Sequence, residues 1–156
     1  MMNIKPGIGI GPIKFGITEK VLIAQLGSPT SIKEQEYIEG TGNWCRELDY
    51  ANRHLSFTFD KEDNYRLSCI NVEGPNILLF DKKLIGQPKA DVIAFIESVC
   101  HGVVSTEDYT WEEDSTLKCA DYESLGIIFW FQSGYLTNMQ CSYLFESDDE
   151  TIIWPK

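Results

Sequence analysis

The feature that most restricts the fold of this chain is an internal repeat. When the sequence is laid over itself with a shift of 72 residues, identical residues coincide without a gap: Tyr37 with Tyr109, Asp49-Tyr50 with Asp121-Tyr122, Phe57 with Phe129, Phe59 with Phe131 and Cys69 with Cys141. Similar residues, such as Leu55 and Ile127, coincide between them. The two repeats cover about residues 5–73 and 76–146. This self-similarity predicts one supersecondary unit that occurs twice.

Each repeat begins with a predicted helix. In the first repeat, the predicted helix lies within residues 16–29. Thr18 caps its start, and Gly27 with Pro29 ends it. In the second repeat, residues 87–102 carry an apolar stripe with i, i+3, i+4, i+7 spacing, formed by Val92, Phe95, Ile96 and Val99.

Four strand-like runs follow each helix, separated by turn residues. They cover residues 32–38, 45–50, 54–60 and 66–72 in the first repeat, and 103–111, 117–122, 126–132 and 137–145 in the second. The alternation of apolar and polar residues is typical of a sheet with one buried face. We therefore predict an α+β protein: two tandem helix-plus-antiparallel-β-meander repeats packed as one body, a single domain over residues 1–156 with an acidic C-terminal tail.

The charge of the chain limits its partners. The formal net charge is -11 and the sequence pI is about 4.5. Nucleic-acid binding needs clustered Lys and Arg, so we expect no nucleic-acid partner. An acidic surface attracts basic proteins, although the same charge also serves solubility.

The sequence also indicates a location. No stretch approaches ~20 apolar residues, and the N-terminus does not resemble a signal peptide, so we expect no membrane span. The odd set of five cysteines has no C-x-x-C spacing, which favours free thiols over zinc sites or disulfides. These features predict a cytoplasmic protein.

The glycine-rich segment at residues 5–20 resembles a phosphate-binding loop only superficially. Ile17 occupies the position where a Walker-type loop has its lysine. The corresponding segment of the second repeat, residues 76–92, lacks a glycine cluster. We therefore expect structural glycines and no cofactor.

Catalytic and metal-binding motifs are not evident. Cys100 and His101 are adjacent, but neighbouring helical residues point about 100° apart, which is unsuited to a nucleophile and its base. The acidic segment at residues 146–153 lacks the glycine turn and spacing of a calcium loop. We predict no enzyme and no metal site, with a cysteine enzyme built on Cys100 and His101 as an alternative.

The best candidate for partner binding is the segment at residues 105–116, in which aromatic residues are surrounded by acids. Aromatic side chains supply buried area at protein interfaces, while carboxylates pair with Lys and Arg. A structural role for the tyrosines is the other interpretation. The predicted contacts are Tyr109, Trp111, Glu112, Glu113 and Asp114, with Glu36, Glu39, Asp148 and Asp149 further out.

Residues 11–32, with the sequence GPIKFGITEKVLIAQLGSPTSI, resemble the opening of a module shared by bacterial beta-lactamase inhibitor proteins and small outer-membrane assembly lipoproteins. The inhibitor proteins carry this module twice. The resemblance implies a fold and a tendency to bind proteins. Unlike those families, this chain shows no export signal or lipidated cysteine near its start.

In its small size, strong acidity and expected cytosolic character, the chain is also similar to bacterial immunity proteins, which block a cognate toxin. Our leading hypothesis is a non-catalytic, cytoplasmic immunity protein that occludes the active site of a basic, nuclease-like toxin. The alternative is a small-ligand or envelope-associated binding domain with the same fold.

Overall fold

The computed structural model describes residues 2–100, 106–110 and 116–156, with the backbone alone for residues 106–110. The helices are α1 (Glu19–Leu26) and α2 (Lys89–Val99). The long strands are β4 (Ser31–Glu36), β5 (Trp44–Tyr50), β6 (Leu55–Asp60), β7 (Arg66–Val72), β10 (Thr106–Thr110), β11 (Leu117–Tyr122), β12 (Ile127–Gln132) and β13 (Tyr135–Ser142). The short strands are β1 (Asn3–Lys5), β2 (Gly9–Ile10), β3 (Ile13–Lys14), β8 (Leu78–Leu79), β9 (Lys82–Lys83), β14 (Leu144–Phe145) and β15 (Ile152–Ile153).

The long strands form one eight-stranded sheet in the order β10-β11-β12-β13-β7-β6-β5-β4. All neighbouring pairs in this sheet are antiparallel. Each half of the chain contributes four consecutive strands, and the halves meet where β7 pairs with β13. The predicted α+β class with an antiparallel sheet is therefore confirmed.

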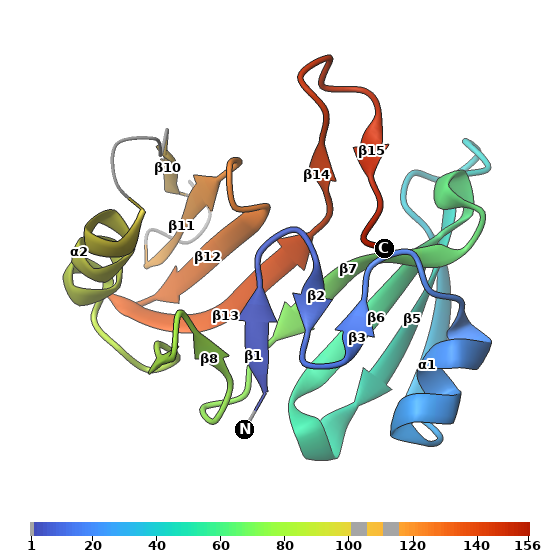
Figure 1. Ribbon diagram of the computed structural model, residues 1–156, viewed down its shortest axis with the longest axis horizontal. Coiled ribbons are helices and arrows are strands. Elements are labelled where there is room, and N and C mark those ends of the chain that lie inside the picture. Colours follow the sequence, from blue (N-terminus) through green and yellow to red (C-terminus); the bar gives the residue numbers. More distant parts are fainter. Residues whose placement is uncertain (1, 101–105, 111–115) are drawn as a thin grey trace.

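One face of the large sheet, which we call the inner face, carries the hydrophobic core. Alternate residues of its strands are buried there, because successive side chains of a strand point to opposite faces. A second, small sheet is formed by five short strands in the order β3-β2-β1-β8-β9. Apolar residues of both helices and of this small sheet, including Leu22, Val92 and Ile13, belong to the same core cluster. Figure 1 shows α1 and α2 at opposite ends of the molecule, with the small sheet between them.

Helix α1 is short, and its ends are set by two residues that the sequence singled out. The Thr18 hydroxyl accepts a hydrogen bond from the Val21 amide at 3.4 Å, which partners one of the unpaired donors of the first turn. Gly27 has a φ of 85° and donates its N–H to the Ile23 carbonyl at 2.8 Å. A positive φ is unstrained for glycine, so Gly27 ends the helix.

The glycine-rich segment forms a β-hairpin, because β2 pairs with β3 antiparallel. Three of its amides bond to protein carbonyls: Gly11 to Asn3, Phe15 to Ile8 and Gly16 to Leu67, at 2.9 to 3.0 Å. This hairpin joins β1, β8 and β9 in a five-stranded sheet that the sequence did not predict. Its strands are only two or three residues long, which gives too little periodicity to recognise.

We expect Gly9→Ala to lower the free energy of unfolding by about 2 kcal/mol or more. Gly9 has a φ of 151°, and an added Cβ would lie 1.9 Å from the Ile13 carbonyl oxygen. Gly40→Ala is the matched control, since Gly40 has a φ of 85° but no atom within 4 Å of an added Cβ. Urea unfolding of both variants measures the difference. Equal losses would show that the contact with Ile13 is relieved by a small shift.

The two halves correspond in structure through β6 and β12. A register shift lies between Thr58 and Phe59 in the first half and between Trp130 and Phe131 in the second, at positions 72 residues apart. Tyr50 packs edge-on against Phe57 at 5.6 Å between ring centroids, and Tyr122 against Phe129 at 5.3 Å. The shared tyrosines and phenylalanines therefore occupy the same places in the two meanders.

The gap-free match fails in the last strand of each meander. Leu55 pairs with Val72, whereas its counterpart Ile127 pairs with Cys141. Val72 therefore corresponds to Cys141, and the predicted correspondence of Cys69 with Cys141 is wrong. The cause is turn length, since residues 61–65 connect β6 to β7 but only residues 133–134 connect β12 to β13.

The C-terminal acidic segment folds into a hairpin, β14–β15, beyond the large sheet. Figure 1 shows this hairpin projecting away from the rest of the molecule. The last predicted strand, at residues 137–145, ends earlier than expected, because β13 stops at Ser142 and the chain then turns into β14.

Candidate functional site

The candidate site lies on the other face of the large sheet, which we call the outer face. One row of directly paired residues crosses it from β11 to β5: Asp121, Ile128, Gln140, Asn71, Ser56 and Asp49. We call this set the cross-strand row. All six side chains are half-buried. The row has a carboxylate at each end and uncharged residues between them.

Three hollows adjoin the cross-strand row and share lining residues. The largest, of about 820 Å³, lies at the Asp121 end, and the second, of about 390 Å³, lies at the Asp49 end. The third, of about 380 Å³, lies between them. It shares Cys69 and Gln140 with the first hollow, and Glu47, Ser56 and Asn71 with the second. We call these three adjoining hollows together the depression; they extend across both halves of the chain.

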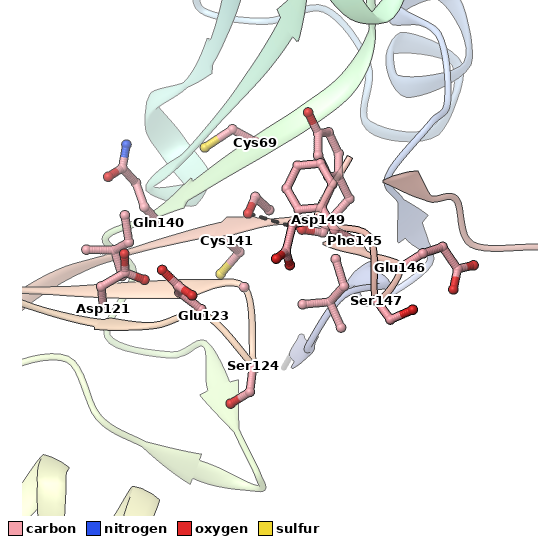
Figure 2. Close-up of a pocket in the computed structure, with 15 residues that line it drawn as sticks. Cys69, Asp121, Glu123, Ser124, Gln140, Cys141, Phe145, Glu146, Ser147 and Asp149 are labelled. Carbon is pink, nitrogen blue, oxygen red and sulfur yellow. Dashed lines mark hydrogen bonds between the residues drawn. The ribbon is translucent and has the colours of Figure 1, made fainter. Parts of the chain in front are cut away.

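The hollow at the Asp121 end, shown in Figure 2, is lined by β11–β13 and the start of the C-terminal hairpin. Its charged residues are all acidic: Asp121, Glu123, Glu146 and Asp149. In Figure 2 the Asp121 and Glu123 carboxylates lie at one end of the hollow, while the Glu146 carboxylate points away from it. Ile128, Leu144 and Phe145 supply apolar surface. A cation with an apolar stem, such as an Arg or Lys side chain, fits this combination.

The hollow at the Asp49 end is also acidic. Its carboxylates are Glu47, Asp49 and Glu73, and His54 lies at its edge in an exposed turn. Glu73 accepts a hydrogen bond from the Asn71 amide at 3.1 Å, which orients the carboxylate along the sheet. This hydrogen bond connects a carboxylate of the second hollow to the cross-strand row.

The middle of the outer face is formed mainly by uncharged side chains that bond to one another, with Glu47 as the carboxylate that lines the middle hollow. The Trp130 indole donates to Gln140 at 2.8 Å, and the Asn138 amide donates to Asn71 at 2.8 Å. The second bond connects strands from the two halves. Hydrogen bonds between side chains limit their rotation, so the conformations of these four side chains are restricted.

The charge of the depression is one-sided. None of the 13 Lys and Arg residues of the chain is among the described residues that line the three hollows. Seven acids do line them: Glu47, Asp49, Glu73, Asp121, Glu123, Glu146 and Asp149. Like charges gathered in a concave surface reinforce each other's field, so the depression attracts cations.

The base of the C-terminal hairpin is attached to the protein by aromatic packing. Tyr143 packs against Phe145 and Trp154, with centroid distances of 5.5 and 5.2 Å, and the Arg66 guanidinium lies 5.4 Å from the Trp154 ring centroid. Tyr143 also donates to the Asp63 carboxylate at 3.0 Å. Burial, followed by this hydrogen bond, raises the pKa of Tyr143, and burial raises the pKa of Asp63. The wall of the largest hollow is thus fixed at its base.

The tip of the hairpin is organised by Asp148. This carboxylate accepts hydrogen bonds from the Thr151 hydroxyl at 2.6 Å and from the Thr151 and Glu150 amides at 2.8 and 2.9 Å. The Thr151 hydroxyl and these amides lower the pKa of Asp148 to about 2, so Asp148 stays charged at neutral pH. The predicted contact Asp148 therefore stabilises the turn, while the predicted contact Asp149 lines the largest hollow.

The other predicted contacts divide into two groups. Trp111, Glu112, Glu113 and Asp114 lie outside the described residues, and of Tyr109 only the backbone is described, in β10 opposite Cys119. Glu36 accepts hydrogen bonds from the Gly40 and Gly42 amides at 2.9 and 2.7 Å, so it holds the turn that follows β4. Glu39 is an exposed residue of that turn. Glu36 and Glu39 are not among the residues that line the three hollows.

Sequence reasoning did not select Asp49 and Asp121 as site residues, although it matched them as a repeated pair. The missing information was strand register, which places both on one row. The alternation of side chains along each strand could have identified these two aspartates. Each precedes a tyrosine that is buried in the core, so its own side chain points to the opposite face of the sheet.

Cysteine and metal chemistry find little support in the described part of the chain. Burial raises the pKa of Cys69 to about 12 and also raises the pKa of Cys100, which disfavours the reactive thiolate. The predicted partner of Cys100, His101, lies outside the described residues. Among the residues with described positions, no group of three His, Cys, Asp or Glu side chains could hold a metal ion.

Comparison with known proteins gives no family. The chain matches no protein-family model, no curated protein and no solved structure. Within the described ranges, neither helix has the length and apolar character needed to cross a bilayer.

Proposed function

We propose that this protein is a non-catalytic binding protein whose outer sheet face receives a basic protein partner. The observation that carries the proposal is the one-sided charge of the depression, which seven acids line and to which no described Lys or Arg contributes. Opposite charge speeds association and suppresses wrong partners. Trp130 and the apolar residues of the largest hollow supply surface that is buried on binding.

The biological role that fits this chemistry best is that of a cytoplasmic immunity protein. Its acidic depression would occupy the cationic active site of a nuclease-like toxin and exclude the nucleic-acid substrate by steric and electrostatic occlusion. Tyr109 belongs to β10, an edge strand of the same sheet. We keep Tyr109, and from the sequence Trp111, Glu112, Glu113 and Asp114, as proposed contacts.

We further propose that the two halves are tandem repeats packed as one body. The matching register shifts, the matching Tyr–Phe pairs and the shared core cluster support this interpretation. In such an arrangement neither half would bury its inner face alone, and the binding surface would exist only when both halves are folded.

A second candidate function is binding of a small cationic ligand. The largest hollow, at about 820 Å³, is within the ~300–1,000 Å³ typical of small-molecule sites. This candidate uses one hollow, whereas a protein partner uses the whole face. Native mass spectrometry of the purified protein distinguishes them, because a retained ligand adds a defined mass.

Capture from a lysate of the source organism tests the leading proposal. The tagged protein is used as bait at about 50 mM and 500 mM salt, and bound proteins are identified by mass spectrometry. We expect one basic protein that is retained at low salt and weakened at high salt, since salt screens surface charges. Glu97→Gln with Asp81→Asn, two exposed acids outside the hollows, is the control bait. A partner whose binding is independent of salt would contradict the electrostatic mechanism.

A further inference from the structure

We infer that the partner contacts this protein through two separate basic clusters, one in each acidic end hollow, held about 24 Å apart along the sheet. This inference rests on the proposed function and specifies the shape of its partner. It follows from three properties of the outer face: acids at equivalent positions of its two ends, uncharged residues in the middle of the cross-strand row, and a fixed separation.

The two ends are equivalent positions of the two halves. Asp49 pairs with Ser56 and Asp121 pairs with Ile128, and both pairs are related by the 72-residue shift that relates Phe57 to Phe129. Each of the two aspartates is accompanied by further acids of its own hollow, Glu47 and Glu73 at one end and Glu123 and Asp149 at the other. The face therefore has an acidic cluster at each end, with three acids in the hollow of Asp49 and four in the hollow of Asp121.

The centre of the cross-strand row differs from its ends. Ser56, Asn71, Gln140 and Ile128 are uncharged, and the two amides are already hydrogen-bonded to Asn138 and Trp130. The carboxylates nearest to the centre, Glu47 and Glu73, belong to the Asp49 end. A basic group placed between Asn71 and Gln140 lies two strands from Asp49 and two strands from Asp121, so it would lose hydration without pairing with either aspartate, which costs free energy. Two positive clusters separated by a neutral segment match the row better than one continuous basic stripe.

The strand order fixes the separation. Asp121 lies on β11 and Asp49 on β5, and the row between them crosses β12, β13, β7 and β6. Five inter-strand spacings of ~4.8 Å give about 24 Å along the sheet. Because all the intervening pairs belong to one hydrogen-bonded sheet, this distance is built into the fold.

Proline rulers provide a direct test. The probes are peptides with two arginines at each end of a proline spacer of 3, 8 or 14 residues, which at ~3.1 Å per residue span about 9, 25 and 43 Å. A peptide with eight prolines and only one arginine pair is the monovalent control. Isothermal titration calorimetry at low salt measures the dissociation constant of each peptide for the full-length protein.

The inference predicts an optimum at eight prolines. That peptide should bind at least about tenfold more tightly than the monovalent control, because the second contact becomes intramolecular. Asp49→Asn with Glu73→Gln, and Asp121→Asn with Glu123→Gln, should each reduce its affinity to the monovalent level. The control variant with Asp81→Asn and Glu97→Gln should bind like the unmodified protein.

Equal affinities for the three spacers, or a loss confined to one end hollow, would overturn the two-cluster inference. Those outcomes would leave the proposed function standing, because the lysate capture is scored separately. Conversely, a clear optimum without any captured basic protein would support the geometry of the face and count against the proposed partner. Circular dichroism of each variant verifies that the fold is unchanged.

Discussion

Replacing Asp49 and Asp121 together by lysine is expected to weaken binding of the captured basic partner at least about hundredfold at low salt. Each substitution exchanges an attractive carboxylate for a like charge facing the partner, and such juxtapositions cost several kcal/mol across an interface. Both side chains are half-buried on the outer face, where screening by solvent is reduced. Surface plasmon resonance over a range of salt concentrations gives the association and dissociation rates.

The association and dissociation rates distinguish long-range electrostatic attraction from direct contacts in the complex. Loss of long-range attraction lowers the association rate and flattens its salt dependence, whereas loss of a desolvated pair raises the dissociation rate. Lysine at Asp81 and Glu97 changes the net charge equally but leaves the outer face intact, so it is the matched control. If this control variant loses as much affinity as the face variant, binding depends on total charge and the site assignment is wrong.

The strands and helices of the two meanders could be predicted from sequence because their signals are local, whereas the joining of the meanders into one sheet was not predicted. Alternation in β6 and β12 fixes which residues face the core, and Thr18 and Gly27 mark the ends of α1. The helices and long strands therefore lie close to the predicted ranges. The fold class follows from their order, since antiparallel strands joined by short turns pair with their neighbours.

The site could not be predicted to the same extent, because it depends on long-range pairing. Only the β7–β13 junction places Asn71 next to Gln140 and brings the two acidic ends onto one row. Sequence reasoning instead selected clusters of acids along the chain. That approach selected Asp149, which lines the largest hollow, together with Glu36 and Asp148, whose carboxylates accept hydrogen bonds within local turns. Carboxylate density does not distinguish these roles.

Phe57→Ala and Phe129→Ala are each expected to lower the free energy of unfolding by about 3–5 kcal/mol. Both side chains have 0% exposed surface, and each packs edge-on against the buried tyrosine of its own half. Removing either ring leaves a cavity that the surrounding sheet and core fill only in part. Phe145→Ala, at a ring that is 48% exposed, should cost about 1 kcal/mol or less.

The number of unfolding transitions shows whether the two halves fold as one unit. Because both phenylalanines belong to one core cluster, each variant should unfold in a single transition at a lower urea midpoint, followed by circular dichroism and tryptophan fluorescence. Trp44 lies in the first half and Trp130 in the second, so the corresponding single-tryptophan variants can report each half separately. If Phe57→Ala unfolds the half around Trp44 while Trp130 keeps its native signal, the halves are independent domains. In that case the cross-strand row would connect two units of different stability. The complete outer face would then exist only while both units are folded.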